Sequence, residues 1–194
     1  LGPDFLILSS HKIGGPKGAG AIIALSDVLM PEPLIRGGGQ EKGHRAGTEA
    51  LPAIAGFGAA AKAAARLVGD ARRLARLRDL AEASVRAIAT DAVIHGANAP
   101  RLPNTLFFSI PGVKAETAQI AFDLAGVALS AGSACSSGKV GPSHVLTAMG
   151  FAEEWGALRL SVGYQTTEAE IEHFAAALTT VVARSGRAKK ADAA

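Results

Sequence analysis

Two helical patterns, over residues 48–67 and 70–89, lie between stretches rich in short strand-like runs. The first pattern is rich in alanine, and Gly69-Asp70 separates it from a second, amphipathic pattern. Such a pair predicts a helical layer that packs on a sheet and then leads to a second lobe. We therefore expect a mixed α/β chain with a domain boundary near Thr90.

The first 25 residues predict a strand, a glycine-rich turn and a second strand. The apolar run 5–8 is typical of a buried strand, and it leads into Ser9-Ser10-His11-Lys12 and a Gly/Pro turn. A lysine that leaves a buried strand is partly desolvated, which favours the neutral amine and Schiff-base chemistry. Ser9 and His11 could donate hydrogen bonds to a phosphate. The alternative is an ordinary surface lysine at the end of a strand.

The second lobe alternates strands and helices, which predicts an α+β domain. Ser143 is a candidate N-cap, and Thr167 with Glu170 has the spacing of a capping box. The last ten residues are charged and rich in alanine, so we expect a disordered tail. The predicted strands are 93–94, 105–110, 127–129 and 157–162, and the predicted helices are 115–124, 143–149 and 167–183.

Cys135 is the single cysteine, and it stands among small polar residues in the segment 130–138. A cysteine kept for packing usually has large apolar neighbours. This setting favours a thiol that moves to a substrate, with a small residue in a tight loop as the alternative. One cysteine excludes an internal disulfide and suits a reducing cytoplasm.

Four segments in order resemble one family, the pyridoxal-phosphate-dependent cysteine desulfurases of the aminotransferase class V group. Ser9 to Gly18 resembles its cofactor-lysine motif, and Ser130 to Gly138 its active-cysteine loop in the subgroup with the longer loop. Two further segments, a Gly-rich Gln-Glu stretch and an Arg-x-Ser-x-Gly stretch, match at 37–49 and 159–171. The resemblance covers roughly residues 1 to 180.

The resemblance implies the C-terminal portion of a fold-type I transferase. Residues 1–89 would be part of the large domain with its connector helix, 90–184 the small α+β domain, and 185–194 a tail. Relatives are about twice this length, and the upstream half supplies the ring-stacking residue and the Asp that pairs with the pyridine nitrogen. We therefore expect this chain alone to be inactive and, because apolar faces would be left bare, poorly soluble.

The resemblance also implies roles for single residues. Lys12 would hold pyridoxal 5'-phosphate, and Ser9 and His11 would lie near its phosphate or ring. Thr48 would bind the phosphate across a homodimer interface, with a simple helix N-cap as its alternative. Arg159 would hold the α-carboxylate of the substrate, for which a guanidinium is suited, with an edge position facing water as its alternative.

The implied activity converts L-cysteine to L-alanine, with the sulphur carried as a persulphide on Cys135. The sulphur would pass to an acceptor or scaffold protein for iron–sulphur or thio-cofactor assembly. Two alternatives stay open: a selenocysteine lyase or other class V enzyme, and a non-catalytic, partner-binding chain.

Charge and composition narrow the other function classes. The formal net charge is +3, but no aromatic residues interleave with the arginines, so we expect a solvated helix face and no nucleic-acid partner. No apolar run of about 18 residues occurs, so we expect no membrane span. The spacing of the histidines predicts no metal site, and His44 stands where a phosphate-binding P-loop would need a lysine.

Overall fold

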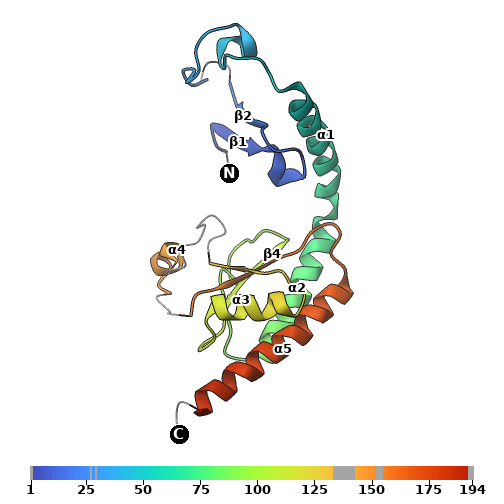
Figure 1. Ribbon diagram of the computed structural model, residues 1–194, viewed down its shortest axis with the longest axis vertical. Coiled ribbons are helices and arrows are strands. Elements are labelled where there is room, and N and C mark those ends of the chain that lie inside the picture. Colours follow the sequence, from blue (N-terminus) through green and yellow to red (C-terminus); the bar gives the residue numbers. More distant parts are fainter. Residues whose placement is uncertain (1, 27, 29, 133–142, 152–154, 192–194) are drawn as a thin grey trace. The chain divides into compact units, whose positions relative to one another are not determined.

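The structure, a computed structural model, describes residues 2–26, 28, 30–132, 143–151 and 155–191, with side chains described as far as Ser185. The chain forms two compact units, Leu1–Gly69 and Asp70–Ala194 (Figure 1). The division comes before the boundary predicted near Thr90. It does so because the second long helix packs within the second unit.

Unit 1 begins with an antiparallel hairpin. Strands β1 and β2 pair in a register that runs from Phe5↔Ala24 to Ser9↔Gly20. A long helix, α1, follows the glycine-rich segment and has Pro52 in its first turn, where the missing N–H costs no hydrogen bond. The elements of unit 1 are β1 (Phe5–Ser9), η1 (Ser10–Ile13), β2 (Gly20–Ala24), η3 (Gln40–Gly43) and α1 (Leu51–Leu67).

The hairpin is exposed, and the prediction of a buried first strand is wrong for the described chain. Ile7 is 81% exposed and Leu6 49% exposed, so apolar side chains stand uncovered on both faces of β1. The strand forms as predicted because its residues favour extended backbone. The described residues leave this strand mostly exposed.

The turn after η1 lies against α1. A Cβ added to Gly56 of α1 would come within 2.7 Å of Pro16 Cγ, so only glycine lets the turn approach the helix this closely. The turn is closed by main-chain hydrogen bonds from Ser10 N to Ala19 O and from Gly15 N to Ser10 O, both 3.0 Å. These contacts fix the backbone on either side of Lys12.

By length and composition alone, the helical stretch Leu51–Ile88 is apolar enough to cross a membrane. The stretch is interrupted by η4 (Val68–Asp70), and α1 itself has 17 residues, at the lower end of the ~17–25 that a span requires. Five arginines follow in α2. One helix of this kind is weak evidence for a span, because core helices of globular proteins pass the same test.

Unit 2 is a four-stranded antiparallel sheet in the order β3-β4-β6-β5, with three helices packed on it. β6 lies between β4 and β5, with Leu106 opposite Leu160 and Ser130 opposite Arg159. Its elements are α2 (Ala71–Ile88), β3 (Val93–Ile94), β4 (Thr105–Ser109), α3 (Ala115–Leu124), β5 (Ser130–Ala131), α4 (His144–Ala148), β6 (Leu158–Ser161) and α5 (Glu168–Ala191).

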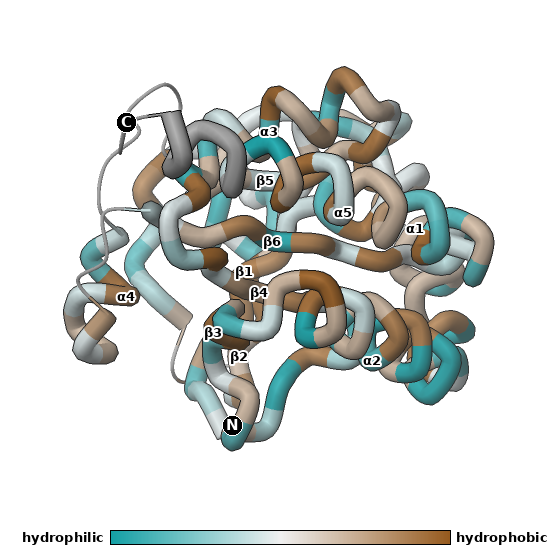
Figure 2. Tube along the Cα trace, turned by 90° about the horizontal axis from the view of Figure 1, so that it is seen from below, coloured by the Kyte–Doolittle hydropathy of each residue, from teal (hydrophilic) through white to brown (hydrophobic). Residues whose placement is uncertain are grey.

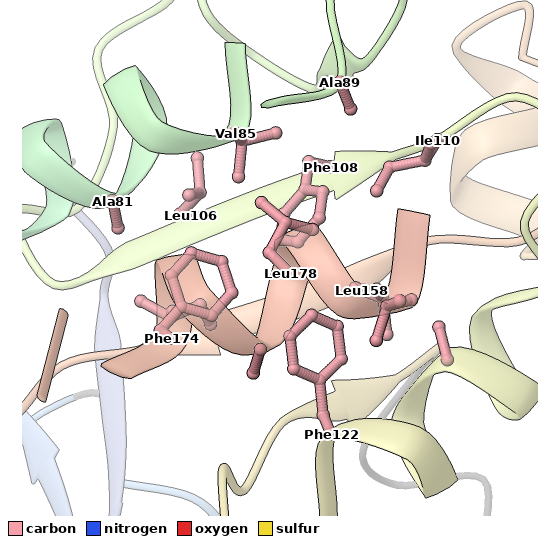
Figure 3. Packing of buried hydrophobic residues seen from close by; sticks show 14 of the residues in the cluster. Ala81, Val85, Ala89, Leu106, Phe108, Ile110, Phe122, Leu158, Phe174 and Leu178 are labelled. Atoms are coloured by element: carbon pink, nitrogen blue, oxygen red, sulfur yellow. The ribbon is translucent and has the colours of Figure 1, made fainter. Parts of the chain in front are cut away.

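One face of this sheet meets α2, α3 and α5 in the core. Figure 3 shows Phe108 of β4, Phe122 of α3 and Phe174 of α5 pointing toward one another. The rings of Phe122 and Phe174 stack at 5.6 Å, and each fully buried ring contributes about 1.5–3 kcal/mol. Hydrophobic and hydrophilic residues alternate along α2 (Figure 2), because one side of the helix faces this core.

Several arginines of α2 are ion-paired within unit 2. Arg73 binds the Asp70 carboxylate and donates to Thr166 O at 2.8 Å and Tyr164 O at 2.7 Å. The Glu82 carboxylate forms ion pairs with Arg86 and with Arg101, each at an N–O distance of 2.8 Å. These bonds fasten α2 to the turn after β6 and to the loop before β4.

The short-range predictions for unit 2 are confirmed. The helix 115–124 has the predicted bounds, and Ser143 caps α4 by accepting from Leu146 N. In the capping box, Thr167 N donates to Glu170 Oε2 at 2.8 Å, and Glu170 N donates to Thr167 Oγ1.

Two predictions for unit 2 differ from the structure. The strand predicted at 127–129 forms at Ser130–Ala131, because its pairing with β6 sets its position. α5 continues to Ala191, where a disordered tail was predicted from residue 185, since the alanine-rich segment extends an already formed helix.

Candidate active site

Lys12 lies in the 3₁₀ turn that follows β1, and its side chain is exposed. Ser9, at the end of β1, forms a hydrogen bond of 2.9 Å between its Oγ and His11 Nδ1. The structure thus brings three of the predicted site residues into one turn. The desolvation argued from a buried strand is not provided by the described residues, because β1 is itself exposed.

Ser10 is a polar residue in this turn to which the sequence prediction gave no role. It is fully buried, and its Oγ has no hydrogen-bond partner among the described residues. A buried hydroxyl without a partner costs about 1–3 kcal/mol, so the turn retains unused hydrogen-bonding capacity. The Ser9 hydroxyl, the His11 imidazole and the Lys12 amine, within four residues, are a set that suits a phosphorylated carbonyl cofactor.

Thr48 is exposed and lies ahead of α1. The helix starts at Leu51 and its N-cap is Ala50, so the alternative of Thr48 as a simple N-cap is wrong. Gly47, with φ +96°, shapes the backbone just before Thr48. The hydroxyl is therefore not used as a cap by α1.

Arg159 lies on β6, an interior strand of its sheet, so the alternative of an edge arginine facing water is wrong. The residue is half-buried, and its Nη2 donates to Ser130 Oγ at 3.4 Å. Its Nε is buried without a hydrogen-bond partner in the described part of the chain. A guanidinium held in a sheet with a donor left over is suited to a carboxylate.

Cys135 lies outside the described residues, which stop at Gly132 and resume at Ser143. Both flanks of its segment belong to unit 2, as Arg159 does, whereas the Lys12 turn belongs to unit 1. The predicted site residues therefore fall into two groups, one in each unit. Among the residues with a described position, no cluster of His, Cys, Asp and Glu is arranged to hold a metal.

Comparison with known proteins identifies the family. The model for the family described as aminotransferase class V matches residues 1–174. The chain belongs to this family. Its members include pyridoxal-phosphate-dependent cysteine desulfurases, so the cofactor implied by the resemblance is confirmed for the family.

Individual relatives agree with this assignment. A cysteine desulfurase of Cereibacter sphaeroides is 42% identical over 92% of this chain, and cysteine desulfurase IscS 1 of Archaeoglobus fulgidus is 41% identical over 95%. The structure of a NifS-like protein from Rickettsia africae matches with a TM-score of 0.81 at 36% identity, covering 93% of this chain and 48% of that one. The fold class predicted from the sequence is confirmed.

The chain spans about half the length of these relatives: 46% of the Cereibacter protein and 48% of the Archaeoglobus protein. The apolar residues of the unit 1 hairpin have no covering layer among the described residues. The term "completed chain" is used below for a protein that contains this chain and is extended to the length of its relatives.

Proposed function

We propose that the completed chain is a cysteine desulfurase that converts L-cysteine to L-alanine and carries the sulphur as a persulphide on Cys135. The observation that carries this proposal is the Ser9–Lys12 turn, which presents an exposed amine beside hydroxyl and imidazole groups, in a chain whose relatives are cysteine desulfurases. We propose further that this chain by itself is inactive, since it spans about half of the relatives' length.

Lys12 would bind the cofactor aldehyde, and Ser9 and His11 would lie near its phosphate or ring. When bound, pyridoxal phosphate supplies an electron sink for bonds broken next to the substrate α-carbon. The Lys12 amine would accept the α-proton of the substrate and return it.

Arg159 would bind the substrate α-carboxylate. Its interior position on β6 fixes the guanidinium, and its unpartnered Nε provides a second donor beside Nη2. Two parallel hydrogen bonds would orient the substrate as well as bind it.

The Cys135 thiolate would attack the sulphur of the bound cysteine. A sulphur–sulphur bond forms, the Cβ–S bond of the substrate breaks, and its electron pair stays with the carbon, where a proton completes alanine. The products are alanine and a persulphide, so the step needs no external oxidant. This role rests on the sequence motif, since Cys135 lies outside the described residues.

We also propose a cytoplasmic homodimer that passes sulphur to an acceptor or scaffold protein for iron–sulphur or thio-cofactor assembly. The single cysteine suits a reducing compartment, and the exposed Thr48 is available to a partner subunit. The relative named IscS 1 and the NifS-like structure support this direction.

The test is alanine and sulphide release from L-cysteine by the completed chain, with pyridoxal phosphate and a reductant. Lys12→Ala and Cys135→Ser should each abolish release, and Lys62→Ala, an exposed lysine of α1, should not. Release that survives Cys135→Ser would instead indicate a lyase that does not carry sulphur on this thiol, with selenocysteine lyase as the first candidate. A wild type without activity would contradict the proposal.

A further inference from the structure

A short hydrogen-bond chain crosses unit 2 on the sheet face opposite the core. His95, which follows β3, is 6% exposed, and its Nε2 lies 2.7 Å from Ser109 Oγ. Ser109 in turn donates to Gly156 O at 2.7 Å. Neither His95 nor Ser109 has a place in the family motifs found in the sequence, and nothing in the proposed chemistry uses them.

The direction of these bonds fixes the protonation of His95. Ser109 gives its single hydroxyl hydrogen to Gly156 O, so toward His95 it can only accept. His95 Nε2 therefore carries the proton. Its Nδ1 is buried and has no hydrogen-bond partner among the described residues. Burial lowers the pKa of His95, which agrees with a neutral ring.

The hydrogen-bond chain His95–Ser109–Gly156 ends beside the N-terminal flank of the cysteine segment. Gly156 is followed by Ala157, whose carbonyl accepts from Gly132 N at 3.0 Å, and Gly132 is the last described residue before Cys135. Trp155, on the other side of Gly156, accepts from Ala115 N at 2.7 Å. Through Ser109, His95 thus holds the strand segment to which this flank is bonded.

The same histidine supports the C-terminal flank. The Phe151 ring stands edge-on to His95 at a centroid distance of 4.9 Å, and Phe151 N donates to Leu146 O at 2.8 Å. Leu146 is the one buried residue of the short helix α4, which starts next to Ser143. A cavity of about 140 Å³ lies here, lined by Ser143, Leu146, Phe151 and Trp155 together with His95 and Ser109.

His95 also reaches the substrate-binding side of the sheet. Its ring contacts Phe107 at 5.1 Å, and Phe107 is the cross-strand neighbour of Arg159 on the same face. The His95 ring therefore contacts Ser109 and Phe151, which support the two flanks of the cysteine segment. It also contacts Phe107, the cross-strand neighbour of Arg159.

We propose that His95, acting through Ser109, is a positioning residue that fixes the two flanks of the Cys135 segment relative to Arg159. The inference rests on the proposed function for its effect on turnover, but its geometric content concerns this chain alone. His95 touches no reacting atom. It sets where the thiol-bearing segment begins and ends.

The chain offers matched variants for a test. His95→Gln keeps an N–H donor at the position of Nε2, whereas His95→Leu removes it and leaves an apolar side chain. Ser109→Ala removes the hydroxyl that bonds to both His95 and Gly156 O. Cys135 and Trp155 are the single cysteine and the single tryptophan of these 194 residues, so in this 194-residue chain each gives a site-specific signal.

The first readout is turnover of the completed chain. In His95→Leu and Ser109→Ala we expect kcat for L-cysteine to fall by about tenfold or more with KM within about twofold, since a displacement of ~1 Å can cost on the order of 100-fold in rate. His95→Gln should restore kcat to within a few-fold of the wild type. A fall that His95→Gln does not rescue, or an equal change in kcat and KM, would overturn the proposal.

The second readout needs no turnover and separates this inference from the proposed function. We expect His95→Leu to change the rate of Cys135 alkylation by iodoacetamide several-fold and to shift the emission of Trp155, with His95→Gln close to the wild type in both. These signals decide the inference even if the wild type releases no alanine. Equal alkylation rates and emission in wild type and His95→Leu would overturn it.

Discussion

At the scale of single residues, the account depends most on Arg159. The sequence placed it in a strand, and the structure adds that the strand is interior and that Nε is left without a partner among the described residues. We expect Arg159→Ala to raise KM for L-cysteine about 10- to 100-fold in the completed chain, because hydrogen bonds to charged groups contribute ~1.5–3 kcal/mol. Arg159→Lys should raise KM less than Arg159→Ala does, because the lysine keeps the positive charge. Arg66→Ala, on α1, is the control and should leave KM unchanged.

His95 should make the free energy of unfolding of unit 2 depend on pH. Burial lowers the pKa of His95 below its ordinary 6.5, so the unfolded chain binds the proton more readily than the folded one. The free energy of unfolding of unit 2 should therefore fall as the pH drops below 6.5. Denaturant titrations should show a smaller fall in His95→Gln as the pH drops from 6.5 toward 4.5, near which the carboxylates of Glu82 and Glu170 contribute equally in both proteins. Identical pH profiles would contradict this assignment.

At the scale of elements, local signals predicted what local bonds determine. The capping box of α5 and the Ser143 cap were readable because both partners lie within three residues. The buried β1 and the boundary near Thr90 were not, because burial of a strand and the packing of α2 depend on distant chain. The role of His95 was equally hidden, since its partners Ser109 and Gly156 are far away in sequence.

The capping box also gives a stability prediction. Thr167→Ala removes the hydroxyl that accepts from Glu170 N at the start of α5, and we expect unit 2 to lose about 1 kcal/mol of unfolding free energy. Thr180→Ala, exposed in the interior of the same helix, should cost less or stabilise slightly, because alanine is the better helix former. Denaturant unfolding followed by Trp155 fluorescence would compare the two; equal losses would argue against the cap.

At the scale of the whole molecule, the described residues leave the hairpin of unit 1 largely uncovered. Ile7 and its neighbours on β1 present apolar side chains on a two-stranded sheet, an arrangement that favours association. We expect Ile7→Ser to raise the soluble yield of the isolated 194-residue chain. Leu124→Ser, 82% exposed on α3, is the control and should have a smaller effect. A monodisperse wild-type monomer, unchanged by Ile7→Ser, would refute this view of unit 1.

The measurement that tests the central claim most directly is the mass of the peptide that carries Cys135, taken from the completed chain after one turnover with L-cysteine. We expect a gain of one sulphur atom on that peptide, removed by a reductant, absent in Lys12→Ala and accompanied by an equal amount of alanine. Alanine formed without any sulphur on the Cys135 peptide would contradict it.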